Sequence, residues 1–223
     1  MGKIANGAHS GPSGKIGNLV GSSWRGISYL KSRPVQYRDA KTVVQQTTRM
    51  KMKLTIEFLK ACIPVIRVGF LGYSTPTQAA FHVATSYNYH HGIKGTFPDL
   101  EIDYSQIMVS RGDLPAAEQA KCEPAGERKI KFLWMATSEK TGARHDDTAI
   151  LLAYNPSKKY AAYSLQGSIR ADGETILTVP PGFAGDEVHC YLCFANLPKL
   201  AQEPLAEYVS DSVYLGIAIV PNT

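Results

Sequence analysis

The sequence lacks the short patterns that mark many enzymes and membrane proteins. No Gly-x-Ser-x-Gly, His-Glu-x-x-His or dinucleotide-binding glycine pattern occurs in its 223 residues, and these patterns are the signatures of hydrolases, zinc proteases and nucleotide-binding folds. No apolar run approaches the ~18 residues that a membrane span requires. The first residues contain no continuous apolar stretch of the secretory type. We therefore expect a cytoplasmic protein or a subunit of an assembled particle, with no signal peptide, membrane span or cofactor.

Cysteine is also scarce, and the four cysteines are not spaced like a secreted disulfide scaffold. Cys190 and Cys193 have the C-x-x-C spacing of some zinc sites, and His189 is adjacent. A zinc site of that kind needs a second pair of ligands, which the sequence does not supply. Residues three apart on a strand also point to opposite faces. We expect both cysteines to be packing residues and no metal to bind.

Acidic residues are rare in the first part of the chain. Residues 1–70 contain twelve Lys and Arg but only Asp39 and Glu57, a net charge of +10, whereas the remainder carries −5. Such asymmetry suits a basic segment that meets an acidic partner, although a solvated helix face would have the same composition. The candidate polyanion-binding residues are Lys15, Arg25, Lys31, Arg33, Arg38, Lys41, Arg49, Lys51 and Lys53. Aromatic side chains that could stack on bases are Trp24, Tyr29 and Tyr37.

Two helices are predicted before residue 98. The opening is rich in glycine, which favours loops and short extended pieces over a helix. From Asp39 the apolar residues recur at three- and four-residue steps, which predicts an amphipathic helix with Asp39 as N-cap that ends or kinks at Pro64. Thr75 followed by Pro76 and Gln78 predicts the start of a second helix, which Gly92 should end.

Beyond Pro98 the pattern changes to short β runs separated by turn residues. Seven strands are predicted: 106–110, 129–135, 148–154, 159–165, 175–179, 187–194 and 212–219. Seven short strands in about 115 residues are typical of a β-sandwich. The predicted fold class is α+β, with a basic glycine-rich and helical region over 1–98. A seven-stranded antiparallel immunoglobulin- or fibronectin-III-like β-sandwich should follow over 99–223.

One polar cluster precedes a predicted strand, Arg144-His145-Asp146-Asp147. Two carboxylates beside an imidazole could bind a metal or transfer protons. No nucleophile or third ligand is close in sequence, so we favour a polar loop in which Asp begins a turn. The sequence therefore provides no candidate catalytic residue.

Several phrases of the chain resemble a family of proteins. They are the opening MGKIANGAHSGPSGKIGNLVGSSWRGISYLKSRP, then LLAYNPSKKYAAY, TVPPGFAGDEVHCYLCF and DSVYLG. Together they resemble an uncharacterised domain-of-unknown-function family common in Bacteroidetes, over nearly the whole chain. The resemblance implies no known activity, substrate or catalytic residue.

These observations favour a non-catalytic structural or interaction protein over an enzyme. A subunit of a phage-derived or other multi-subunit assembly is the leading hypothesis, with a protein partner or further copies of the chain as its binding partners. The alternative is a nucleic-acid or polyanion binder that uses the basic N-terminal region.

Overall fold

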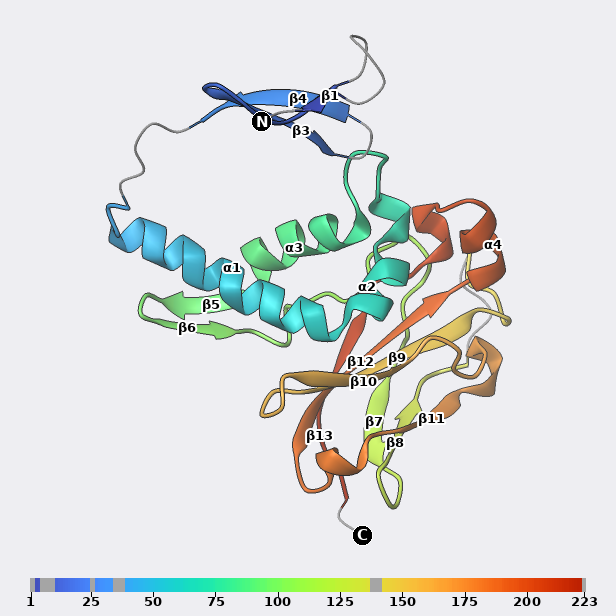
Figure 1. Ribbon diagram of the computed structural model, residues 1–223. Coiled ribbons are helices and arrows are strands. Elements are labelled where there is room, and N and C mark those ends of the chain that lie inside the picture. The colour runs from blue at the N-terminus through green and yellow to red at the C-terminus, as the bar shows by residue number, and fades with distance from the viewer. Residues whose placement is uncertain (1–2, 5–10, 25–26, 34–38, 137–141, 222–223) are drawn as a thin grey trace. The chain divides into compact units, whose positions relative to one another are not determined.

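The computed structural model describes residues 3–4, 11–24, 27–33, 39–136 and 142–221. The protein is a mixture of helices and open antiparallel sheets (Figure 1). It divides into two compact units, Met1–Thr42 and Val43–Thr223. The boundary predicted after residue 98 does not coincide with this division.

The first unit contains a sheet where loops and short extended pieces were expected. Its strands pair in the order β1-β2-β3-β4, all antiparallel. Gly17 and Asn18 form the turn between β2 and β3, and the positive φ of Gly17 (57°) suits such a turn. The strand bounds are β1 Lys3–Ile4, β2 Pro12–Ile16, β3 Leu19–Trp24 and β4 Ile27–Ser32.

The second unit begins with the predicted amphipathic helix, now in two pieces, α1 (Val43–Ala61) and α2 (Ile63–Gly69). Pro64 lies in the first turn of α2, where its missing N–H costs little, so the prediction that it interrupts the helix is confirmed. The predicted N-cap is wrong. The carboxylate of Asp39 accepts a hydrogen bond from the Lys41 amide at 3.2 Å and so closes a turn ahead of α1.

Helix α3 (Ala80–His91) begins later than predicted. The Thr75 hydroxyl does accept a hydrogen bond from the Gln78 amide at 3.0 Å, but this closes a local turn before the helix. Gly92 ends the helix as predicted. A hairpin that the sequence did not reveal follows, β5 (Ile93–Thr96) and β6 (Asp99–Ile102), and it packs against α1 and α3 (Figure 1).

The rest of the chain forms two antiparallel sheets, in the orders β11-β8-β7 and β10-β9-β12-β13. The strands are β7 Lys121–Pro124, β8 Lys129–Leu133, β9 Thr148–Asn155, β10 Tyr160–Ser164, β11 Glu174–Thr178, β12 Glu187–Ala195 and β13 Val213–Ile219. Short helical elements connect them or join the helical region: η1 Leu71–Tyr73, η2 Arg170–Asp172, η3 Pro181–Phe183, α4 Leu197–Gln202 and η4 Ala206–Tyr208.

Six of the seven predicted strands are present, and the strand predicted over 106–110 is wrong. Ile107 and Val109 are buried, but the amides of this segment do not pair with a neighbouring strand. Those of Gln106 and Ile107 donate to the Asp103 carbonyl, and the next two donate to side chains. The Met108 amide donates to Asn88 Oδ1 at 2.9 Å, and the Val109 amide donates to Ser212 Oγ at 3.0 Å. The seventh strand is β7, whose sequence KCEP has no apolar alternation to reveal it.

Two buried clusters of apolar side chains form the core of this unit. The first joins the helices to one face of the β10-β9-β12-β13 sheet and includes Phe58, Ile66 and Leu152. The second lies between the two C-terminal sheets, with Phe132 against Leu192. Strands β9 and β12 are therefore covered on both faces, which explains their nearly continuous apolar sequences.

Candidate interaction surfaces

One face of the N-terminal sheet combines basic and aromatic side chains. The pairing register aligns Lys15, Val20 and Lys31 in one row across β2, β3 and β4. Tyr29 and Trp24 lie two and four positions further along the same face, because alternate residues of a strand share a face. We call Lys15, Lys31, Tyr29 and Trp24 the basic–aromatic face.

The opposite face of this sheet carries aliphatic side chains. Ile16 and Leu19 are cross-strand partners in a row that ends at Ser32 of β4, and Leu30 lies two residues from Ser32 on the same face. We call Ile16, Leu19 and Leu30 the aliphatic face. All three are more than two-fifths exposed, and every residue of β4 is exposed. Within the described residues no strand pairs with the outer edge of β4.

The other predicted basic residues belong to different parts of the chain. Arg33 follows β4 and its amide donates to the Asn18 carbonyl at 2.7 Å, while Lys41 precedes α1. Arg25, Tyr37 and Arg38 lie outside the described residues. Arg49, Lys51 and Lys53 are on α1 in the second unit. The basic residues are therefore divided between two units, and each group forms a surface of its own unit.

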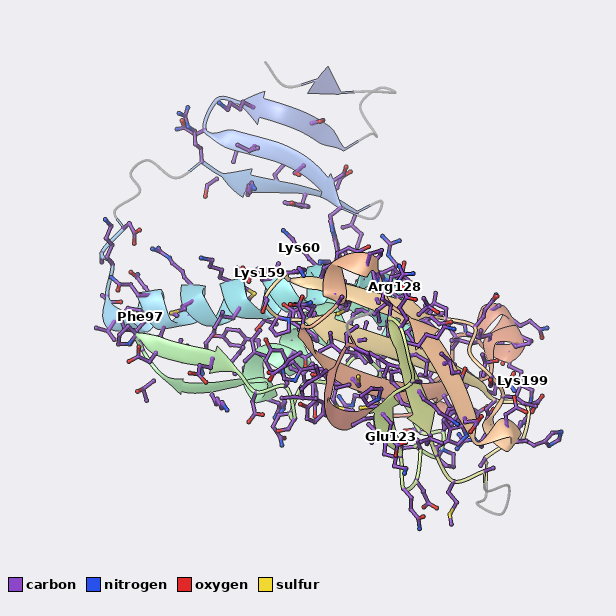
Figure 2. All side chains as sticks on the ribbon, turned by 90° about the horizontal axis from the view of Figure 1, so that it is seen from below. Lys60, Phe97, Glu123, Arg128, Lys159 and Lys199 are labelled. Carbon is purple, nitrogen blue, oxygen red and sulfur yellow. The ribbon has the colours of Figure 1, made fainter. Side chains whose placement is uncertain are left out.

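Helix α1 has a basic and apolar outer surface. Arg49 and Lys53 are four residues apart and share a side of the helix with a shallow hollow that Met52 and Ile56 line. On another side of α1 a second hollow includes Phe97 of the β5–β6 turn and Lys159, both of which lie alongside α1 in Figure 2. There Lys159 Nζ forms an ion pair with Glu57 at 2.8 Å. Part of the positive charge of this surface is thus neutralised by the protein itself.

Comparison with protein families identifies one match. The model of the "Family of unknown function (DUF6266)" covers residues 11–216. The chain belongs to the DUF6266 family. The expectation that nearly the whole chain belongs to a family of unknown function is thereby confirmed, and the DUF6266 match spans both compact units. Comparisons with curated proteins and with solved structures find no match.

The polar cluster before β9 has a structural explanation in this DUF6266 member. Asp147 is fully buried and its Oδ2 accepts hydrogen bonds from the Arg144 amide at 3.0 Å and from Arg170 Nε at 3.2 Å. The guanidinium of Arg170 also donates to the Pro115 carbonyl at 2.7 Å and lies 3.8 Å from the ring centre of Phe194. Burial lowers the pKa of Arg170, and the Asp147 carboxylate opposes that shift. The sequence could not reveal this pair because its members are 23 residues apart.

The C-x-x-C cysteines point to opposite faces of β12, as predicted. Cys190 belongs to the cluster between the two C-terminal sheets, and Cys193 belongs to the cluster beneath the helices. Among the described residues no group of three His, Cys, Asp or Glu side chains is placed to hold a metal ion. In the same part of the chain no helix is both long and apolar enough to cross a membrane.

His189, next to this pair, is a buried histidine inside an aromatic cluster. Its ring stacks on Tyr104 with 3.6 Å between centroids, and its Nδ1 is 2.8 Å from the Tyr214 hydroxyl. Burial lowers the pKa of His189 from 6.5 to about 4. The folded DUF6266 chain therefore keeps this imidazole neutral where an unfolded chain would protonate it.

Stability is expected to fall as the pH decreases from 6.5 to 4. In that window the unfolded state binds a proton at His189 that the folded state does not, so lower pH favours unfolding by up to about 3 kcal/mol. The measurement is urea denaturation at a series of pH values. His189→Gln should flatten this part of the profile, whereas the same change at the exposed His90 should leave it unaltered. An unchanged slope in His189→Gln would contradict the assignment.

Proposed function

We propose that this DUF6266 protein is a non-catalytic interaction protein that associates with further copies of itself through its N-terminal sheet. The observation that carries the proposal is the exposure of this sheet. Its large apolar side chains are exposed by 42% at Tyr29 to 54% at Ile27, and they lie on both faces. Such self-association suits a subunit of a multi-subunit particle.

A sheet of this size needs apolar contacts that its own unit does not provide. Among residues 13–16 of β2 and all of β3 and β4, only Gly21 is buried. Isolated sheets become stable when at least one face is covered, and domains of about 40 residues bury little surface by themselves. Contiguous exposed apolar side chains mark contact sites in soluble proteins.

Two further features favour a second copy as the partner. The outer edge of β4 presents backbone donors and acceptors that an edge strand of another copy can pair with. The charge of the chain is also complementary to itself, since residues 1–70 carry +10 and the remainder carries −5. A homo-oligomer would bring these opposite charges together between copies.

The test is sedimentation velocity of the full chain. At ~100 μM the wild-type chain should sediment as a dimer or larger species, a concentration at which even modest interfaces are occupied. Leu30→Lys places a charge on the aliphatic face and should shift the chain to monomer. Ile176→Lys is the matched control, because Ile176 is 53% exposed on β11 and Leu30 is 51% exposed on β4. A wild-type chain that remains monomeric would sink the proposal.

A second part of the proposal concerns the fold of the C-terminal region. We propose that the two C-terminal sheets form an immunoglobulin- or fibronectin-III-like sandwich, an architecture that serves many adhesive modules. Three strands oppose four, and the chain crosses between the sheets after β8, β10 and β11. Side chains from both sheets contribute to one buried cluster, which supports this arrangement.

Polyanion binding is the second candidate, and the basic–aromatic face favours it. Lys15 and Lys31 can contact phosphates while Tyr29 and Trp24 offer stacking surfaces for bases. Fluorescence anisotropy with labelled single-stranded DNA at ~50 mM salt tests this candidate, because phosphate contacts are strongest at low salt. Binding should weaken in Lys15→Glu/Lys31→Glu and persist in the exposed control Lys129→Glu. No binding by the wild-type chain at that salt concentration would remove this candidate.

A further inference from the structure

Two of the four cysteines come from different sheets and meet each other. Cys122 is on β7 of the β11-β8-β7 sheet, and Cys190 is on β12 of the β10-β9-β12-β13 sheet. The two thiols are close enough for each to shift the pKa of the other. Both thiols pack on the cluster between the sheets, where Cys190 is fully buried and Cys122 is partly buried.

Contacts with strand β13 also place Cys122 close to Cys190. Cys122 Sγ lies 3.6 Å from the carbonyl oxygen of Leu215 on β13. The next residue, Gly216, is the ladder partner of Cys190 on β12. Cys122 is therefore held against the very part of β13 that pairs with Cys190.

The four thiols differ in access and in reactivity. All four are free, and Cys62, Cys190 and Cys193 are buried whereas Cys122 is partly exposed. Interaction with the Cys190 thiol lowers the pKa of Cys122, while burial raises the pKa of Cys193 to about 12. Because the thiolate is the nucleophile in thiol–disulfide exchange, Cys122 should react first.

We propose that Cys122 and Cys190 form a disulfide between the two C-terminal sheets when the protein meets a low-molecular-weight disulfide such as glutathione disulfide. The Cys122 thiolate attacks one sulfur of glutathione disulfide, which breaks the S–S bond, releases one glutathione thiolate and leaves a mixed disulfide at Cys122. Cys190 then loses its proton, attacks Cys122 Sγ and displaces the second glutathione. Two protein thiols are oxidised and one glutathione disulfide is reduced to two glutathione thiols.

The disulfide would join an edge strand to an interior strand. β7 is at the edge of its sheet and β12 lies inside the other sheet. The bond closes the chain between residues 122 and 190, and closing a long loop restricts the unfolded chain. The oxidised protein should therefore melt roughly 5–15 °C above the reduced protein.

The experiment uses the full chain, reduced, freed of reductant and equilibrated with glutathione disulfide. Acid quenching, denaturation and alkylation with N-ethylmaleimide then allow the remaining thiols to be counted by mass spectrometry. We expect two thiols to remain of the four, the loss of two hydrogen atoms, a peptide that links Cys122 to Cys190, and a higher melting temperature.

Matched variants separate this pair from the other cysteines. Cys62→Ala and Cys193→Ala should still form the disulfide. Cys190→Ala should stop at the glutathione adduct on Cys122, and Cys122→Ser, a change at the partly exposed site, should lose the reaction even if Cys190→Ala fails to fold. Four thiols remaining in the wild-type chain, a lasting glutathione adduct there, or a linked peptide with any other pairing would overturn the proposal.

Discussion

Replacing Arg170 with Met is expected to destabilise the protein by about 3–5 kcal/mol, because the change leaves the buried carboxylate of Asp147 without its counter-charge. Asp147 is fully buried, and its Oδ1 already has no hydrogen-bond partner among the described residues. The Pro115 carbonyl also loses the donor that now lies 2.7 Å away. A methionine can fill the volume beside Phe194 but can supply neither charge nor hydrogen bond.

The measurement is urea denaturation of both chains at neutral pH. Lys131→Met is the matched control, since Lys131 forms an ion pair with Glu174 at 2.6 Å in which both side chains are substantially exposed. Exposed pairs contribute at most about 1 kcal/mol, so this control should unfold near the wild-type midpoint. If Arg170→Met lost no more stability than Lys131→Met, the buried pair of Arg170 and Asp147 would not stabilise the fold.

Replacing Phe58 with Ala should lower the free energy of unfolding by a similar amount, about 3–5 kcal/mol, because it leaves a cavity between helix α1 and the β10-β9-β12-β13 sheet. The Phe58 ring is fully buried, and its centroid lies 4.6 Å from that of Tyr154 on β9 and 6.2 Å from that of Tyr191 on β12. These contacts make the helical region and the sheet share one core, so a defect in one should destabilise the other.

The Phe58 prediction has an internal control on the same helix. Met52 is 38% exposed, so Met52→Ala should change stability by less than about 1 kcal/mol. In a Trp24→Phe background the remaining tryptophan, Trp134, reports on the cluster between the C-terminal sheets. Its fluorescence and the helical circular dichroism should change together during unfolding. Separate transitions would instead support the domain boundary predicted after residue 98.

Much of the strand pattern could be predicted from the sequence because local signals and tertiary packing agree there. Lys129–Leu133 alternates polar and apolar residues, and turn residues separate the runs that follow. The prediction failed at 106–110, where Ile107 and Val109 are buried but the amides of Met108 and Val109 donate to the side chains of Asn88 and Ser212. Burial is visible in composition, whereas the partner of a backbone amide is not.

The basic–aromatic face of the N-terminal sheet could likewise be predicted only in part from the sequence. The basic and aromatic composition of the N-terminal region was evident in the sequence, but loops were predicted there. Only strand pairing places Lys15 and Lys31 in one row and Tyr29 on the same face. Lys51 and Lys53, counted with them in the sequence, belong instead to helix α1 of the second unit.

The sequence alone determined the helical periodicity, the interruption at Pro64, six strands of the C-terminal sheets and the opposite directions of Cys190 and Cys193. Each of these depends on the geometry of neighbouring residues along one segment. The tertiary structure alone decided that Arg170 neutralises Asp147, that Phe58 joins a helix to two strands, and that Cys122 meets Cys190. Those contacts join residues far apart in the chain, and their partners are chosen by the packing of whole elements, which no local pattern encodes.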